Sequence, residues 1–103
     1  MVWDKKMIGK RIRELRIMLD KTSKELSAEL NCSRQTLMLW ETGRNLPYAE
    51  ALFNLAQALH TTTDYLLGLE NEKTLTINGL SNEEIAALYP LIELFLKEKK
   101  EAI

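Results

Sequence analysis

Apolar residues recur at intervals of three and four along most of this chain, which is the period of an α-helix with one buried face. A first helix is predicted from about residue 4 to residue 19, with an inward stripe of Ile8, Ile12, Leu15 and Leu19. A later helix ends near His60 and buries Leu52, Leu55, Ala56 and Leu59. Thr62 then caps a short helix, residues 63–67, that stops at Gly68, the usual residue just beyond a helix end. The pattern predicts an all-α fold.

Between these elements, residues 22–43 contain two short amphipathic helices separated by a few residues. Thr22 and Glu25 have the spacing of a capping box, and Ser33 is a suitable N-cap for the second helix. The residues expected to face inward, at one-turn spacing, are Leu26, Leu30, Leu37 and Trp40. Asn31 tolerates positive φ and suits the tight turn between the two helices. This is the sequence form of a helix-turn-helix.

The C-terminal third has a different character. Residues 70–80 predict a linker or a short extended segment, because Leu75 and Ile77 alternate weakly with threonines, and we expect the domain boundary there. A second capping box, Ser81 with Glu84, opens a helix to about residue 100 within the segment 81–103. Pro90 is expected to kink this helix or to split it after Leu88. Its apolar face is wider than one small domain covers, which predicts dimerisation through Ile85, Leu88, Leu91, Ile92, Phe95 and Leu96.

Composition and charge limit the classes of function. The 103 residues carry a net charge of −1, but residues 1–24 hold eight basic groups against three acidic ones, beside the helix-turn-helix. A single cysteine, Cys32, rules out an intramolecular disulfide and cannot by itself hold a metal. One histidine, no glycine-rich phosphate loop and no carboxylates beside a base argue against an enzyme, and no cofactor or metal is predicted. Without a long apolar run or a secretory signal, we expect a cytoplasmic protein that does not enter membranes.

Residues 8–69 resemble the Cro/repressor, or XRE-type, helix-turn-helix family. The matching strings are IGKRIRELR, TSKELSAEL, SRQT followed by WETGR, and LAQAL with DYLLG. The resemblance implies a five-helix lambda-repressor-like DNA-binding domain, here residues 1–69, plus a C-terminal helix. It also implies an ion pair between Arg16 and Glu41, and major-groove reading by the helix that starts at Ser33.

The expected DNA contacts divide into two groups. With Leu37 and Trp40 inward, the residues predicted to reach base edges are Arg34, Gln35, Met38 and Leu39. The residues suited to phosphates are Arg16, Thr22, Ser23, Lys24, Ser33, Thr36, Thr42, Arg44 and Asn45. Ser23 departs from the family pattern, which usually has a phosphate-contacting Gln there. Met38 and Leu39 depart from it as well, because polar side chains are common at those positions.

Two functions follow from this sequence. The first is a sequence-specific transcriptional regulator that binds double-stranded DNA as a homodimer on a palindromic operator. Of the regulator classes, a repressor is the favoured interpretation. The second is a helix-turn-helix protein-interaction or antitoxin-like module, in which Met38 and Leu39 face a protein and DNA binding is weak or absent.

Overall fold

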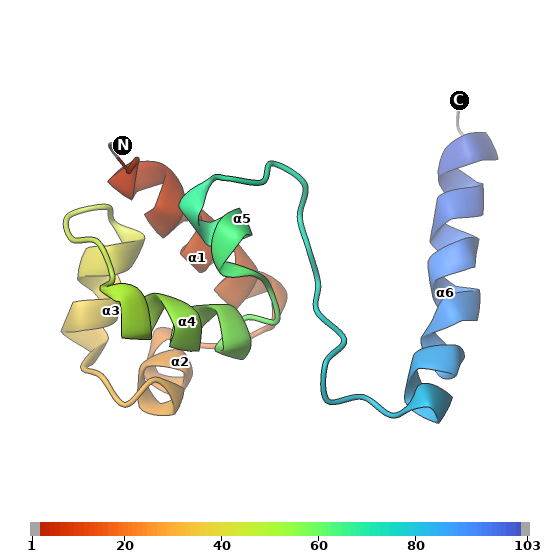
Figure 1. The fold of residues 1–103 in the computed structure, drawn as a ribbon, viewed down its shortest axis with the longest axis horizontal. Coiled ribbons are helices and arrows are strands. Elements are labelled where there is room, and N and C mark those ends of the chain that lie inside the picture. Colours follow the sequence, from red (N-terminus) through yellow and green to blue (C-terminus); the bar gives the residue numbers. More distant parts are fainter. Residues whose placement is uncertain (1–2, 102–103) are drawn as a thin grey trace.

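The computed structural model describes residues 3–101, which contain six α-helices and no strand. The first five helices form one group around a shared core, as Figure 1 shows. They are α1 (Lys5–Met18), α2 (Ser23–Glu29), α3 (Arg34–Glu41), α4 (Ala49–Ala58) and α5 (Thr63–Leu67). Helix α1 packs on α3 and α5, α2 packs on α3, and α4 packs on α5. No helix in the described range is both long and apolar enough to cross a membrane.

The core is built from the predicted stripes. The side chains that are almost fully buried are Ile8, Ile12, Leu26, Leu37, Leu55, Leu59 and Leu66. Trp40 and Tyr65 also belong to the core, at 5% and 4% exposure, as do the buried α4 residues Ala51, Leu52 and Ala56. Each of the first three helices contributes buried residues from its predicted face, so the hydrophobic pattern positions α3 against α1 and α2.

Local capping defines where the helices begin. Asp4, Thr22, Ser33 and Thr62 each accept a backbone N–H of the first turn that follows them. The capping box of α2 is complete, since the Glu25 carboxylate also accepts the Thr22 amide at 3.0 Å. These bonds satisfy amide donors that have no partner inside the helix.

Each of the first five helices ends in the same way, with a residue at positive φ and a backbone bond that reaches back over the last turn. The positive-φ residues are Asp20, Asn31, Gly43, His60 and Gly68, of which only two are glycines. The prediction for Asn31 is confirmed at φ 54°, and His60 has the same value. These tight endings let short helices turn sharply enough to share one core.

Residues 69–81 connect this group of helices to α6 (Asn82–Glu101), which stands apart in Figure 1. The segment is irregular: the alternation of Leu75 and Ile77 gives no strand here. It is nevertheless held against the helices, because the Thr76 amide donates to the His60 carbonyl at 2.8 Å. Leu75 and Thr74 also line a 300 Å³ apolar cavity with Leu15, Met18, Leu19 and Leu59.

Helix α6 begins with the predicted capping box, in which the Ser81 amide donates to Glu84 and the Glu84 amide donates to the Ser81 hydroxyl. It runs without a break through Pro90, so of the two outcomes expected there the split after Leu88 is wrong, and the kink stays a prediction. Proline removes one donor from the helix, but the turns on both sides retain enough bonds to continue. The predicted interface residues on α6 are exposed, except Ile85, which is half-buried.

The capping box of α2 makes stability depend on pH. Hydrogen bonds from the backbone and side chain of Thr22 lower the pKa of Glu25 below its ordinary value of 4.5. A carboxylate with a depressed pKa stabilises the folded state above the unfolded pKa, and this contribution is lost as the pH falls through the folded pKa. We expect Glu25→Gln to lower the melting temperature at pH 6 and to lower it by less as the pH falls below 4.5, as followed by circular dichroism. An effect of the same size at pH 6 and at low pH would contradict this prediction.

Candidate nucleic-acid interface

The rotation of α3 about its axis decides which of its side chains reach solvent. Leu37 and Trp40 are buried at 0% and 5% exposure, and they turn the opposite face of the helix outward. Arg34 and Gln35 are exposed on that face, and Met38 is 59% exposed. These three positions therefore have the exposure that base contact requires.

Leu39 differs from the expectation, because it is half-buried. The loop after α3 folds back over this position, and the amides of Arg44 and Asn45 donate to the Leu39 carbonyl at 3.0 and 3.2 Å. The same bonds hold the backbone of Arg44 and Asn45 beside the end of α3, while their side chains remain exposed. The structure thus brings the two predicted loop contacts to the end of α3.

Several of the predicted hydroxyl contacts already have partners within the protein. The Ser33 and Thr36 hydroxyls lie 2.8 Å apart, and Ser33 also accepts the Thr36 amide at 3.0 Å. Thr42 donates to the Met38 carbonyl at 2.8 Å. The Thr22 hydroxyl accepts the Glu25 amide at 3.0 Å. These side chains are thereby held in fixed orientations at the ends of α2 and α3.

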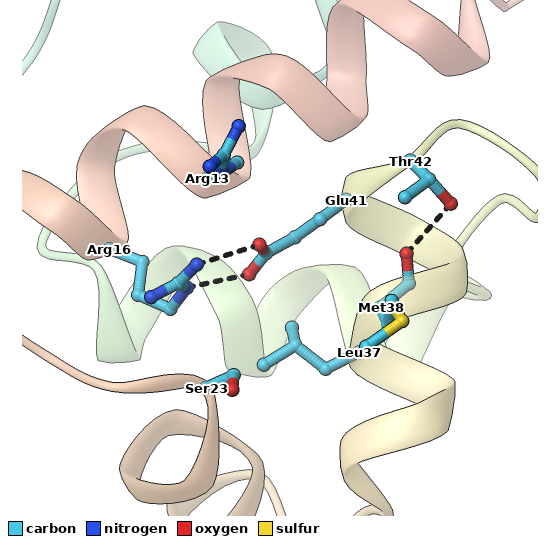
Figure 2. Close-up of a pocket in the computed structure, with 7 residues that line it drawn as sticks. All are labelled: Arg13, Arg16, Ser23, Leu37, Met38, Glu41 and Thr42. Atoms are coloured by element: carbon cyan, nitrogen blue, oxygen red, sulfur yellow. Dashed lines mark hydrogen bonds and ion pairs between the residues drawn. The ribbon is translucent and has the colours of Figure 1, made fainter.

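A groove of about 480 Å³ lies where α1, α2 and α3 meet. Figure 2 shows its lining, which combines Arg13, Arg16, Ser23, Leu37, Met38, Glu41 and Thr42. It joins the outward face of α3 to Ser23, at the start of α2, and to the cationic side of α1. Predicted base and phosphate contacts that are far apart in the sequence therefore border one continuous depression.

Arg13 is a member of this groove that the sequence did not single out. It is exposed and lies one helical turn before Arg16 on α1. Arg13 could have been predicted from the sequence, because its i, i+3 spacing from Arg16 places both arginines on one face of the helix. Its exposed guanidinium adds positive charge to the α1 side of the groove.

The predicted ion pair between Arg16 and Glu41 is bidentate, and Figure 2 draws its two hydrogen bonds as dashed lines. Arg16 Nε and Nη2 donate to the two carboxylate oxygens at 2.8 and 3.0 Å, and Nη1 donates to the Lys21 carbonyl at 3.0 Å. The side chains are only 14% and 8% exposed. Hydrogen bonding to Glu41, and then its charge, raise the pKa of Arg16 despite the opposing effect of burial. The geometry favours a structural role for Arg16, and its phosphate contact stays a prediction.

Not all of the positive charge in residues 1–24 is available to a partner. Arg11 lies over the Tyr65 ring, 4.3 Å from its centroid, and donates to the backbone carbonyls of Tyr65 and Glu70. Lys21 bonds Glu29 and the Ala58 carbonyl, each at 3.0 Å. Together with Arg16, these residues use their charge to join the helices. Lys24 and Arg13 remain as exposed cations near the groove.

Comparison with known proteins gives consistent matches. The helix-turn-helix family HTH_3 matches residues 12–66. The transcriptional regulator ImmR of Bacillus subtilis is 32% identical over 85 residues, which is 79% of this chain and 67% of ImmR. The P22 c2 repressor, solved with a synthetic operator, superimposes with a TM-score of 0.60 at 31% identity, covering 62% of this chain and 97% of that one.

Two further solved structures have related folds. The restriction-modification controller protein C.AhdI of Aeromonas hydrophila has a TM-score of 0.58 at 25% identity, covering 61% of this chain and 96% of its own. A transcriptional regulator from Listeria innocua covers 84% of this chain and 90% of its own, with a TM-score of 0.57. Its 23% identity supports the likeness of fold alone.

Proposed function

Since this chain belongs to the XRE-type helix-turn-helix family, we propose that it is a sequence-specific DNA-binding transcriptional regulator that acts as a repressor. The observation that carries this proposal is the outward face of α3. Arg34, Gln35 and Met38 are exposed there because Leu37 and Trp40 are buried on the other side. The named relatives are a repressor solved with its operator, a controller protein and a transcriptional regulator, and they support the same role.

The reading mechanism follows from the chemistry of these side chains. Arginine can donate two bonds to guanine O6 and N7, and glutamine can pair with adenine N6 and N7. Arg34 and Gln35 lie in the first turn of α3, the part of a recognition helix that enters the major groove. Met38 adds an apolar surface that suits the methyl group of thymine.

The surrounding contacts orient this helix on the DNA backbone. Lys24 in α2 and Arg44 and Asn45 in the loop after α3 are exposed, and Ser23 and Thr42 border the groove beside α3. Such residues bind phosphates and determine register without selecting sequence. We propose that Arg13 joins this set, because it lies at the same groove.

We further propose that the active species is a homodimer on a palindromic operator, with the two copies joined through α6. Six large apolar side chains of this helix are between 49% and 59% exposed, namely Tyr89, Leu91, Ile92, Leu94, Phe95 and Leu96. A patch of this kind on a small protein marks an interaction site. Two-fold symmetry in the protein would be matched by an inverted repeat in the DNA.

Selection of bound DNA from a random pool tests this function. We expect the sequenced survivors to contain an inverted repeat, and Gln35→Ala to relax the preference at one position in each half-site, at a cost of about 1–3 kcal/mol there. Lys73→Ala, an exposed cation in the linker, is the control and should leave the motif unchanged. A folded protein that enriches no motif would overturn the proposal.

The 59% exposure of Met38 supports a second candidate, a module whose α3 face binds a protein. The two functions differ in their dependence on salt. DNA binding should weaken steeply as salt rises, with a slope that becomes shallower in Arg44→Ala because one phosphate contact is lost. A protein contact should tolerate salt and weaken in Met38→Ser instead.

A further inference from the structure

Helix α6 carries a regular seam of apolar residues that are exposed, except Ile85, which is half-buried. Positions spaced by three, four and three residues carry Ile85, Leu88, Ile92 and Phe95. This is the a/d pattern by which one helix packs along another. Three more apolar residues lie directly beside the seam: Tyr89, Leu91 and Leu96. Pro90 falls on the side of the helix opposite the seam, where its ring does not obstruct a partner helix.

We propose that α6 pairs with α6 of a second copy in the antiparallel orientation, in a register centred on Pro90. This inference rests on the homodimer proposed above and specifies its geometry. Ile85 then packs against Phe95 of the second copy, and Leu88 packs against its Ile92. Near the centre, Tyr89 approaches Tyr89 of the second copy, and Leu91 approaches Leu91 of the second copy. The seam and the apolar residues beside it are buried together.

The distribution of charge along α6 favours this orientation. Its first turn carries Glu83 and Glu84, whereas Lys97 and Lys99 lie near its other end. Antiparallel pairing brings the acidic end of one copy to the basic end of the other and sets the two helix dipoles in opposition. Glu98 lies near Glu84 of the second copy, and the two lysines that flank Glu98 offset this repulsion.

The parallel alternative is less favourable at both ends. Lys99 occupies the next seam position after Phe95. In a parallel pair, this lysine would face Lys99 of the second copy inside the interface, and the four glutamates of the two first turns would lie together. In the antiparallel register, Lys99 instead faces Ser81 of the second copy, beside Glu84.

The antiparallel pair also gives a suitable separation for DNA. In this register, Ser81 of the second copy lies level with Lys99 of the first, eighteen residues along the helix from Ser81. At a rise of 1.5 Å per residue, the two copies of Ser81 would lie about 27 Å apart along the helix axis. Half-sites one turn apart on DNA are separated by about 34 Å. A parallel pair would bring the two Ser81 residues to about 10 Å, the distance between packed helices. The antiparallel arrangement therefore needs the smaller adjustment in the linkers.

Disulfide trapping between two variants tests the orientation without DNA. Ile85→Cys and Phe95→Cys are made separately in a Cys32→Ala background, and one of them carries a size tag. The two are mixed, unfolded and refolded together, and then oxidised and separated on a non-reducing gel. We expect the mixed disulfide to exceed the homodisulfides by about tenfold, because two copies of residue 85 lie about 15 Å apart along the axis in this register. Circular dichroism of the reduced proteins verifies folding.

The other outcomes separate this inference from the proposed function. Homodisulfides without the mixed product would establish a parallel pair and overturn the orientation, while leaving the homodimer intact. A protein that sediments as a dimer but forms neither product would overturn this pairing of α6 and leave the homodimer standing. A monomer that still selects an inverted repeat would overturn the α6 pair and leave the DNA-binding function standing.

Discussion

Gly9→Ala is expected to destabilise the protein by about 2–4 kcal/mol, although alanine normally stabilises a helix relative to glycine. Gly9 is buried in α1 where this helix crosses α3. A Cβ atom at this position would lie 2.3 Å from the Trp40 carbonyl oxygen and 2.6 Å from that of Glu41. Both contacts are with backbone, which cannot move aside as a side chain can. The two helices must separate to accept the methyl group.

The effect is measurable by urea or thermal unfolding. For a domain of this size, the expected loss is about 10–20 °C in melting temperature. Lys10→Ala, the adjacent exposed position on the same helix, is the matched control and should be within about 0.5 kcal/mol of the native protein. If Gly9→Ala is as stable as this control, α1 does not lie as close to the backbone of α3 as described above.

Gly9 also shows where prediction from the sequence ends. The caps and turns at Thr22, Asn31, Ser33 and Gly68 were predictable because each depends on residues within a few positions along the chain. The requirement for glycine at position 9 comes instead from carbonyl groups more than thirty residues away. No local pattern contains that information.

The distribution of usable charge was hidden for the same reason. The count of basic residues in the N-terminal region was correct, but Arg11 and Lys21 bond backbone carbonyls of Tyr65, Glu70 and Ala58. Which cations face outward depends on how α1 packs against α5 and on the end of α4. The hydrophobic stripes predicted the fold because burial follows helical periodicity, whereas the hydrogen-bonding partner of a long side chain does not.

At residues 74–77 and at Pro90 the local pattern left two outcomes open, a linker or a short extended segment at the first and a kink or a split at the second. The alternation of Leu75 and Ile77 has the period of a strand, but a strand needs a neighbouring strand. Among the described residues, the only backbone bond from this segment to a distant part of the chain is the one that the Thr76 amide donates to His60. At Pro90 the helix lacks one backbone donor, but it continues on both sides of the proline. The local pattern alone did not decide the outcome in either case.

Breaking the pair between Arg16 and Glu41 is expected to cost about 2–4 kcal/mol of folding stability, in either Arg16→Ala or Glu41→Ala. Each variant leaves a charged partner in a site where the side chains are only 14% and 8% exposed. The double variant should lose less than the sum of the two single variants, because it removes both charges. Urea unfolding of the four proteins gives the coupling energy.

The exposed pair between Lys10 and Glu14 is the control for this cycle, since its atoms lie 3.9 Å apart and its side chains are 76% and 42% exposed. Its coupling should not exceed about 0.5 kcal/mol. Equal coupling in the two pairs would mean that burial adds nothing to the Arg16 pair. A large difference would establish that Glu41 fixes the end of α3, the proposed recognition helix, to α1, which carries Arg13. Loss of this anchor should then weaken DNA binding even under conditions where the variants remain folded.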